Sequence, residues 1–370
     1  MTAFTDGDRA HMAHALELAA RGMYTTTPNP RVGCVIVRDG TVIGEGFHAR
    51  AGAPHAEVEA LADAARRGAD TRGATMYVTL EPCNHHGRTP PCVDAVLAAG
   101  IGRVVVALPE PSRDAAGGAQ RLRAAGVAVD TGLLADDARE QNIGFVARVT
   151  RGRPWVRTKI AASLDGRTAL ANGASRWITG EAARADGHAW RARACAILTG
   201  IGTVLQDDPE LTVRAVATTR QPRRVIVDRH GQTPATARVL AGDGALVVTA
   251  AERNPAWSAS VEALTLPDAH GRVDLAAMLA ALAARGVNEL HVEAGAKLNG
   301  ALLEAALVDE LLLYVAPAAL GDPARGMFER ALPLPSLAQR AQFAWHDVQR
   351  IGEDLRLIAR RVERGLSPAE

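Results

Sequence analysis

The chain has few cysteines, four among its 370 residues, at positions 34, 83, 92 and 195. That number is too small for a disulfide framework. The chain also lacks an apolar run of the roughly 20 residues that a membrane-spanning helix needs, and no secretory signal is recognisable near Met1. We therefore expect a cytoplasmic protein with reduced thiols, in which the close pair Cys83 and Cys92 binds a metal.

The sequence also lacks an excess of either charge, because 42 basic residues face 41 acidic ones and leave a net charge of +1. Without a basic, aromatic-bearing stretch, neither nucleic acid nor a membrane is indicated as the partner. Hydrophobic residues make up 48% and charged residues 22%, which is typical of globular protein. A length of 370 residues predicts two domains.

The first half alternates predicted strands and helices. A helix over 11–22 and a proline-containing loop precede a hairpin around Asp39 and Gly40. Helices are then predicted over 56–67, 92–100 and 135–149, strands over 76–80 and 103–109, and a short helix with a strand over 118–132. This order predicts a layered α/β domain over 1–150 whose site lies at strand and helix ends.

The second half begins with a predicted strand from Trp155 to about Ala162 and a turn at Asp165 and Gly166. Helices are predicted over 181–194 and near 274–284 and 298–306, and strands over 194–205, 223–228, 245–250, 288–295 and 309–317. The pattern predicts a second α/β domain over 154–370, with no internal repeat.

His55, Cys83 and Cys92 supply the ligand types of a catalytic zinc site, which uses three protein ligands and keeps a fourth position open for water. Glu57 need not bind the metal to be useful, since it can carry a proton from that water to a leaving amine. A His-x-Glu followed by Pro-Cys and a further cysteine is the signature of zinc deaminases. The departure here is eight residues between the cysteines where that signature has two.

Two other interpretations of these residues stay open. His55 alone is compatible with an ordinary helix-start histidine, and Glu57 with a favourable charge at a helix N-terminus. A closed structural zinc site completed by His85 or His86 is the second, although it leaves Glu57 and the open coordination position without a role.

The second half has no G-x-G-x-x-G between a strand and a helix, so a Rossmann fold is not indicated. VEAGAKLNGALL at 292–303 instead places a strand end at Glu293 and a helix start near Leu298. Backbone N–H groups of such a loop can hold a phosphate. It is not a Walker motif, because Ala301 and Leu302 follow Gly300 where Lys and Ser or Thr belong.

Longer motifs give the chain a family resemblance. With TPNPRVGCVIV at 27–37, HAEVEAL at 55–61 and TLEPCNHHGRTPPC at 79–92, the first half resembles the pyrimidine deaminases of riboflavin biosynthesis, whose cysteines have the same eight-residue spacing. KIAASLDGRTA, SRWITG, ILTGIGTVLQDDPELTVR, VEAGAKLNGALL and LVDELLLYVAP resemble the reductase half of the same bifunctional family. The resemblance implies a cytidine-deaminase-like αβα layered domain followed by a dihydrofolate-reductase-like α/β domain.

The resemblance also implies a bifunctional enzyme that uses Zn²⁺ and NADPH. Its first reaction would be the hydrolytic deamination of 2,5-diamino-6-ribosylamino-4(3H)-pyrimidinone 5′-phosphate, with Glu57 delivering protons. Its second would be the NADPH-dependent reduction of the ribosyl side chain to ribityl. We expect a homo-oligomer that acts on this small molecule and binds neither nucleic acid nor membrane.

Site residues carried over by motif complete the expectation. In the first half, His55, Cys83 and Cys92 bind zinc and Asn29, His48 and Arg88 contact the substrate, Arg88 at its phosphate. In the second half, Lys159, Asp207 and Glu293 are the ionisable groups expected near the reacting carbon. The cofactor is expected to contact Ala161, Trp177, Thr203, Asp207, Gly295, Ala296, Lys297, Leu298, Asn299, Gly300 and Ala301. The substrate is expected to contact Ser175, Arg191, Leu211, Arg214 and Glu293, with the two arginines suited to its phosphate.

Two other functions stay open from the sequence. One is a cytosine, guanine or tRNA-adenine deaminase with a non-catalytic appendage, although the neutral charge argues against nucleic acid. The other is a non-enzymatic zinc module whose domains only bind ligands. Ammonia release from the diaminopyrimidine phosphate separates all three.

Overall fold

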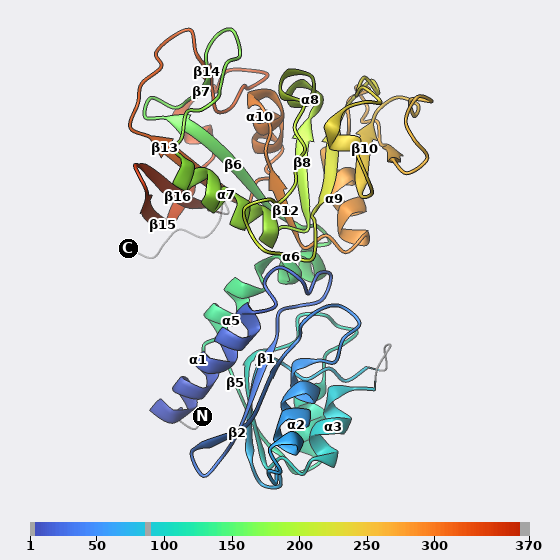
Figure 1. The fold of residues 1–370 in the computed structure, drawn as a ribbon, viewed down its shortest axis with the longest axis vertical. Helices are drawn as coiled ribbons and strands as arrows, with labels where there is room; N and C mark the ends of the chain where they lie inside the picture. Colours follow the sequence, from blue (N-terminus) through green and yellow to red (C-terminus); the bar gives the residue numbers. More distant parts are fainter. Residues whose placement is uncertain (1–3, 86–89, 363–370) are drawn as a thin grey trace. The chain divides into compact units, whose positions relative to one another are not determined.

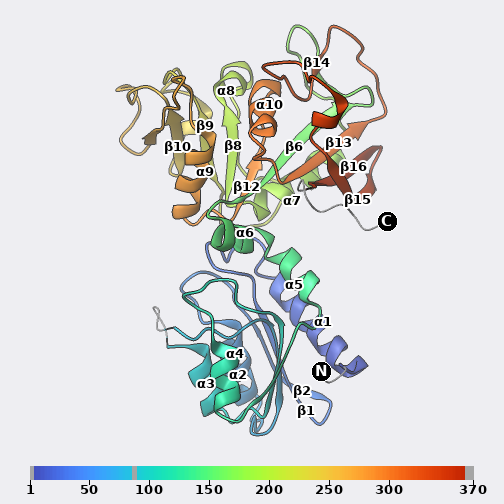
Figure 2. The same cartoon turned by 180° about the vertical axis from the view of Figure 1, so that it is seen from behind.

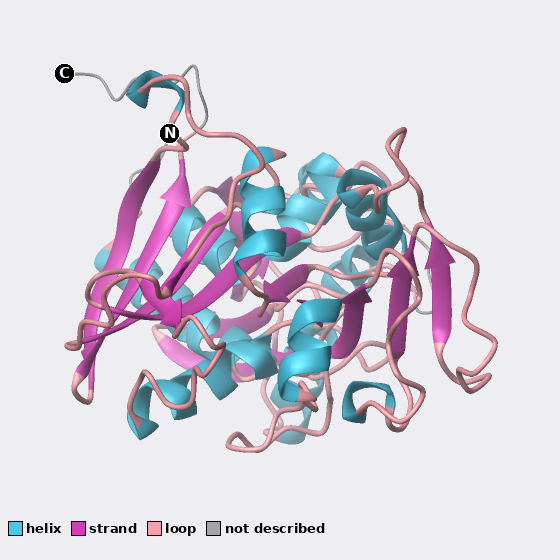
Figure 3. Cartoon of the chain, turned by 90° about the horizontal axis from the view of Figure 1, so that it is seen from above, coloured by secondary structure: helices cyan, strands magenta, loops and turns pink. Residues whose placement is uncertain are grey.

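The structure is a computed structural model that describes residues 4–85 and 90–362. The chain divides into two compact units, Met1–Gly152 and Arg153–Glu370, each built from a sheet and its covering helices (Figure 1). Figure 3 distinguishes the strands of these sheets from the helices. Across the two described ranges, no helix combines the length and apolar character of a membrane span.

The first unit is built on a five-stranded sheet in the order β2-β1-β3-β4-β5. The strands are β1 (Gly33–Arg38), β2 (Thr41–Phe47), β3 (Thr75–Leu80), β4 (Arg103–Leu108) and β5 (Ala128–Thr131). β1 runs antiparallel to β2 and β3, whereas β3, β4 and β5 are parallel. The β1–β2 hairpin turns at Asp39 and Gly40, which both have positive φ, as a two-residue type I′ turn requires.

Helices cover both faces of this sheet. They are α1 (Asp6–Ala20), α2 (Ala56–Arg66), α3 (Cys92–Ala98), α4 (Gly118–Ala124), α5 (Ala135–Gln141) and α6 (Ile143–Arg151). α1 and α5 lie on one face, and α2, α3 and α4 lie on the other (Figures 1 and 2). α1 approaches β1 so closely that a Cβ on Gly33 would lie 1.9 Å from the carbonyl oxygen of Ala15. Glycine therefore permits this helix to pack on the sheet.

The second unit is built on a nine-stranded sheet in the order β11-β10-β9-β8-β12-β6-β13-β16-β15. The strands are β6 (Trp155–Ser163), β8 (Ala196–Gly200), β9 (Arg223–Val227), β10 (Ala245–Thr249), β11 (Glu262–Thr265), β12 (Glu289–Val292), β13 (Glu310–Ala316), β15 (Phe343–Ile351) and β16 (Asp354–Arg361). The strands from β11 to β13 in this order are parallel, β16 is antiparallel to β13, and β15 is antiparallel to β16. β7 (Arg167–Ala169) and β14 (Arg325–Gly326) form a separate two-stranded sheet.

The helices of this unit are α7 (Glu181–Arg193), α8 (Ile201–Asp207), α9 (Leu275–Ala284) and α10 (Ala296–Glu304), with 3₁₀ turns η1 (Arg238–Leu240) and η2 (Leu337–Gln339). Leu290 and Val292 of β12 share a core with α9 and α10, whereas α7 packs against the opposite face of that strand. The chain direction across the sheet reverses between β8 and β12. Ligands of open parallel sheets bind at such a switch point, beyond the carboxyl ends of the strands.

The helix expected over 11–22 begins earlier, at Asp6, and three further segments differ more clearly from the sequence-based expectation. The single helix predicted over 135–149 is two helices, α5 and α6, because Asn142 at their junction turns its buried side chain to the backbone of Arg31. The strand predicted over 194–205 ends at Gly200 and continues as α8, since a short apolar run does not distinguish strand from helix. The β15–β16 hairpin was not predicted, because β15 is mostly exposed and shows no regular alternation.

Candidate functional site

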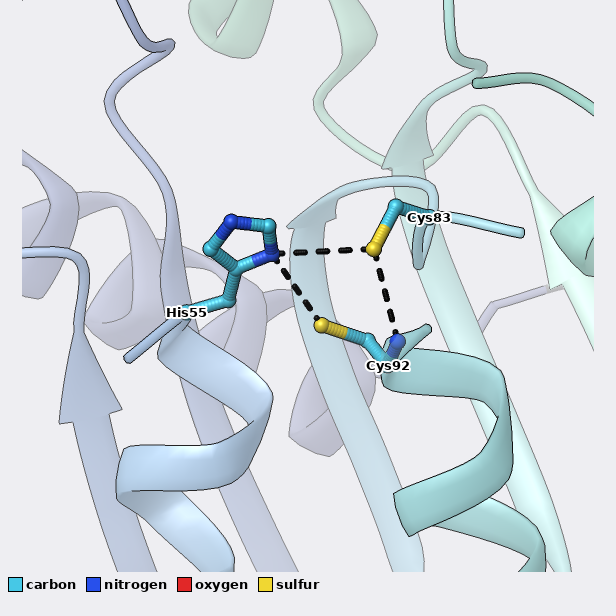
Figure 4. Close-up of side chains that lie close together, drawn as sticks. All are labelled: His55, Cys83 and Cys92. Carbon is cyan, nitrogen blue, oxygen red and sulfur yellow. Dashed lines mark hydrogen bonds between the residues drawn. The ribbon is translucent and has the colours of Figure 1, made fainter. Parts of the chain in front are cut away.

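His55, Cys83 and Cys92 come together from three places in the first unit (Figure 4). His55 precedes α2, Cys83 follows β3, and Cys92 opens α3. Nδ1 of His55 lies 3.2 Å from Sγ of Cys92 and 3.6 Å from Sγ of Cys83. Tetrahedral zinc, with Zn–N of about 2.1 Å and Zn–S of about 2.3 Å, needs N–S separations of about 3.6 Å. The donor set and its spacing therefore fit a zinc ion.

The surroundings of Cys83 favour its thiolate form. Its Sγ accepts a hydrogen bond from the backbone N–H of Cys92, 3.3 Å away at the start of α3. Hydrogen bonding with the Cys92 side chain is the main cause that lowers the pKa of Cys83 far below its ordinary value, and His55 lowers it further while burial opposes both. The thiolate is the metal-ligating form of cysteine.

Glu57 lies in the first turn of α2, 3% exposed, beside the three ligand atoms and not among them. Burial raises the pKa of Glu57, against smaller opposing effects that include His55 and a contact with Cys92. A carboxyl group in that position binds and releases a proton more readily near neutral pH than an exposed one. The geometry is that of a proton carrier next to a metal.

Asn29 and His48 also lie beside this cluster. The Nδ1 atom of His48 lies 3.0 Å from the carbonyl oxygen of Pro54, and Nε2 lies 3.0 Å from Nδ2 of Asn29. The His48 ring meets the His55 ring edge-on with centroids 5.3 Å apart. Burial lowers the pKa of His48, so a neutral ring donates from Nδ1 and accepts at Nε2. Asn29 thus keeps its side-chain oxygen available for another partner.

The remaining candidate residues of the first unit lie between Cys83 and Cys92. Arg88, expected at the substrate phosphate, and His86 lie outside the described residues. His85 is exposed and is not a member of the ligand group. Within the described ranges, His55, Cys83 and Cys92 are the only group of His, Cys, Asp or Glu side chains arranged to hold a metal.

Sequence reasoning missed a supporting role for Glu81. Its carboxylate accepts hydrogen bonds from the backbone N–H of Glu110 at 3.1 Å and of Ala119 at 2.9 Å. These bonds tie the segment before Cys83 to the loop after β4 and to α4. The glutamate of the TLEPC motif was the available signal, but its partners are distant in sequence and carry no motif of their own.

In the second unit, the structure brings Lys159 of β6, Arg191 of α7 and Glu293 after β12 together. Arg191 donates from Nε at 2.5 Å and from Nη2 at 2.8 Å to the two carboxylate oxygens of Glu293, and from Nη1 at 3.1 Å to the carbonyl of Thr212. Arg191 and Lys159 hold the pKa of Glu293 well below its usual range although burial opposes them. Burial lowers the pKa of Lys159. The cluster combines a fixed anion with an amine that releases its proton easily.

The loop before α10 has the features expected of a phosphate-binding loop. Gly295 is the N-cap of α10, no side chain caps the helix, and the space around its Cβ position is open. The Leu298 side chain lies 3.4 Å from the Cβ position of Gly200, so the start of α8 is next to α10. Uncapped N–H groups at this switch point fit the pyrophosphate of a nicotinamide dinucleotide.

Several residues predicted for the reductase site lie outside the Lys159, Arg191 and Glu293 cluster and outside the loop before α10. Trp177 is 70% exposed, with the Arg184 guanidinium 4.6 Å from its ring centroid, so it is not a core aromatic. Asp207 ends α8, and its backbone carbonyl accepts a hydrogen bond from Arg176. Leu211 is buried in a core cluster, so its side chain faces the interior. Arg214 is exposed and donates to Glu210 and Thr212. Ala161, Ser175 and Thr203 are half-buried.

Family models match parts of both units. Residues 154–357 match the family model of the RibD C-terminal domain, and residues 5–108 match the cytidine and deoxycytidylate deaminase zinc-binding region. Riboflavin biosynthesis protein RibD of Escherichia coli K12 is 46% identical over 94% of this chain and 98% of that protein. The RibD protein of Haemophilus influenzae is 42% identical over 96% and 98%.

Solved structures with the same two-part fold also match. Form 1 of Acinetobacter baumannii RibD has 44% identity and a TM-score of 0.89 over 96% of this chain and 99% of that one. A diaminohydroxyphosphoribosylaminopyrimidine deaminase/5-amino-6-(5-phosphoribosylamino)uracil reductase from Thermotoga maritima has 34% identity and a TM-score of 0.89 over the same shares. These findings confirm the expected fold class, the bifunctional deaminase and reductase activity and the zinc-binding region, and the reductase domain implies NAD(P)H.

Proposed function

The chain belongs to the RibD family of bifunctional riboflavin biosynthesis deaminase/reductases, and from this premise we propose that each of its two units carries one reaction. Residues 1–150 are the deaminase and residues 154–370 the NADPH-dependent reductase. The convergence of His55, Cys83 and Cys92 beside buried Glu57 is the observation that carries the first assignment. The cluster of Lys159, Arg191 and Glu293 near an uncapped helix start supports the second.

The deaminase half acts on 2,5-diamino-6-ribosylamino-4(3H)-pyrimidinone 5′-phosphate and removes its 2-amino group as ammonia. His55, Cys83 and Cys92 would hold zinc, which when bound would supply Lewis-acid activation of a water molecule. Glu57 takes a proton from that water and delivers it to the leaving amine, a role that its raised pKa supports. Asn29, oriented by His48, contacts the pyrimidine ring through its remaining amide oxygen, and Arg88 contacts the phosphate.

The reductase half reduces the ribosyl side chain of the deaminated product to ribityl. NADPH, when bound, would supply the hydride; residues Gly295 to Ala301 would contact it, with the N–H groups of the first turn of α10 at its phosphates. Ala161, Trp177, Thr203 and Asp207 complete the cofactor contacts, and Ser175, Arg191, the backbone of Leu211, and Arg214 contact the substrate. Glu293 orients the sugar as a fixed anion, and Lys159, whose pKa burial lowers, provides the proton that the ring oxygen takes up when its bond to C1′ breaks and C1′ receives the hydride.

We further propose a cytoplasmic homo-oligomer that binds no nucleic acid. The outer edge of β15 has no strand beside it in the described part of the chain, and Trp345 and Val348 on it are 66% and 57% exposed. An apolar strand edge of this kind is stabilised by pairing with another chain. Light scattering at micromolar concentration measures the oligomeric state, and a monomer would contradict the proposal.

Ammonia release and NADPH oxidation, measured on the full chain with the diaminopyrimidine phosphate, test the two assignments together. Glu57→Gln should keep zinc and reduce ammonia release by about 10³-fold or more, because only the proton carrier is removed. Its NADPH oxidation on pre-deaminated substrate should equal that of the wild type. Cys83→Ala is the matched comparison, and it should lose zinc as well as deamination.

Three outcomes would contradict the proposal. Equal loss of both activities in Glu57→Gln would show that Glu57 is not a local proton carrier. Zinc retained at full occupancy in Cys83→Ala would exclude Cys83 as a ligand. Zinc binding without ammonia release from the wild type would favour the non-enzymatic zinc module.

A further inference from the structure

His291 is a fully buried histidine whose role neither the fold nor the proposed function explains. It lies in the middle of β12 with an exposed fraction of 0%. Among the described residues, neither Nδ1 nor Nε2 has a hydrogen-bond partner in the structure, and Oε1 of Glu293 lies 3.3 Å from Nε2. Burying an imidazole without partners destabilises the fold, whereas a leucine at this position would not. A compensating role is therefore needed.

The strand geometry places His291 on the functional face of the sheet. Side chains two residues apart along a strand share a face, and the pairing of β12 continues to Glu293, whose N–H donates to Leu198 at 2.8 Å. Glu289, His291 and Glu293 thus all point toward α7, where Arg193 binds Glu289 and Arg191 binds Glu293. His291 stands between these two ion pairs, and it is paired in register with Arg157 of β6.

The charges around His291 determine its protonation. Burial lowers the pKa of His291, and the neighbouring cations Arg157 and Arg191 lower it further, while Glu293 opposes them. A neutral imidazole carries one N–H. Because the Glu293 carboxylate is the acceptor beside the ring, the proton belongs on Nε2, 3.3 Å from Oε1. A small rotation of the ring aligns this N–H with Oε1 and adds a third donor to a carboxylate that Arg191 already holds through two.

We propose that His291 is a positioning residue of the reductase half, which fixes the orientation of the Glu293 carboxylate by donating from Nε2 to Oε1. Arg191 holds Glu293 from α7 and the Thr212 carbonyl, whereas a donor from β12 itself anchors the carboxylate to the sheet. The inference rests on the proposed contact of Glu293 with the sugar. His291 itself touches neither the substrate nor the cofactor.

Two substitutions of His291 test this inference in the full-length protein. His291→Leu keeps the volume and removes the donor, and it should lower kcat for NADPH-dependent reduction about tenfold, as loss of an outer-shell partner does. His291→Gln places an amide N–H near the position of Nε2 and should restore kcat to within about threefold of the wild type. Ammonia release by the same preparations is the internal control and should not change.

A matched control separates positioning from stability. Thr158→Val removes a buried hydroxyl that has no hydrogen-bond partner, from the residue of β6 that pairs with Val292 and points to the opposite face of the sheet. It should leave kcat unchanged. Equal loss of kcat in His291→Leu and His291→Gln, with parallel losses of thermal stability, would show a purely structural histidine and overturn the inference.

The double variant distinguishes this inference from the proposed function on which it rests. If His291 acts through Glu293, then adding His291→Leu to Glu293→Gln lowers kcat no further than Glu293→Gln alone. Full activity in His291→Leu beside an inactive Glu293→Gln would refute the inference and leave the role of Glu293 intact. Full activity in Glu293→Gln would refute that role itself.

Discussion

At the scale of single residues, Asp8 joins more of the first unit than any motif suggests. Its carboxylate accepts hydrogen bonds from the backbone and hydroxyl of Thr5, from the hydroxyl of Tyr77 and from Arg103, which also binds Asp130. These partners lie at the start of α1, on β3 and on β4. Asp8 is 4% exposed, so the accepting end of each bond is shielded from bulk water. Asp8 therefore connects a helix to two strands.

The Asp8 network predicts a pH-dependent contribution to stability. The hydrogen bonds from Arg103, Thr5 and Tyr77 hold the pKa of Asp8 far below its ordinary value, although burial opposes them. A depressed pKa stabilises the fold fully above the unfolded pKa of about 3.9, and the contribution is lost as pH falls through the folded pKa. Asp8→Asn should lower the free energy of unfolding by about 1–3 kcal/mol at pH 7. The deficit should shrink below about pH 4.

Chemical denaturation of the two proteins between pH 2.5 and 7 checks this expectation. Asp130→Asn is the control, because it removes a partly exposed partner of the same arginine and should cost less than about 1 kcal/mol. A deficit that stays constant down to pH 2.5 would refute an ionised, stabilising Asp8.

The zinc ligands were predictable at this scale because their chemistry is local to short motifs. His55, Glu57 and Cys83 stand in motifs of a few residues, and the strand between them brings the motifs to one end of the sheet. The role proposed for His291 could not be predicted, since it depends on Arg157 and Arg191, which are close to His291 only in the folded protein. Glu81 was missed for the same reason.

At the scale of elements, α10 shows that one glycine of a ligand loop serves packing. A Cβ on Gly300 would lie 1.8 Å from the carbonyl oxygen of Glu329, whose N–H donates to Ala296. Asn299 donates to Met327 in the same segment. Gly300 therefore permits the chain at 327–329 to lie against α10. Gly295 has open space at its Cβ position and is the better candidate for contact with phosphate.

Gly300→Ala should consequently displace either α10 or the 327–329 segment. We expect a loss of about 2–4 kcal/mol in the unfolding free energy of the second unit, with weaker NADPH binding, because the backbone oxygen cannot yield as a side chain can. Thermal unfolding with and without NADPH measures both effects. Gly187→Ala in α7 is the matched control, since its Cβ position is open and alanine favours helix. Wild-type stability in Gly300→Ala would contradict the packing role.

Elements were predicted well where periodicity was strong and poorly where a single tertiary contact decided the outcome. The hairpin at Asp39–Gly40 follows from turn chemistry alone. The break between α5 and α6 depends on the hydrogen bond between Asn142 and Arg31. These residues are far apart in sequence, so no local sequence pattern predicts the contact. β8 and α8 share one apolar run, and only the sheet and the glycine at 200 separate them.

At the scale of the whole molecule, each unit has its own hydrophobic core. One buried cluster runs from Met12 to Ala138 within the first unit, and the clusters that begin at Val156, Ile197 and Ala183 lie within the second. Gly152, in a left-handed conformation at the end of α6, precedes the boundary. Domains with separate cores can fold separately.

We therefore expect fragments 1–152 and 153–370 to fold and work apart. The first should bind zinc and release ammonia, and the second should oxidise NADPH on the deaminated substrate, each with kcat within about threefold of the full chain, because each site takes its residues from one unit. Steady-state assays and calorimetry of both fragments measure this. A first fragment that binds zinc but has no deaminase activity would show that its site needs the second unit.

The pairing of β6 has a consequence for the order of events during synthesis. Residues 155–158 of β6 form hydrogen-bonded pairs with residues 289–292, and β6 also pairs with β13 over 310–316. The first strand of the second unit therefore has no neighbour in its sheet until most of the polypeptide has emerged from the ribosome. Such non-local pairing makes folding slow, whereas the first unit is complete much earlier and can fold as translation proceeds. A newly made chain should thus form its zinc site first. Because β6 stays unpaired until its distant partner strands are made, mutations or heat should cause aggregation during biosynthesis mainly through the second unit.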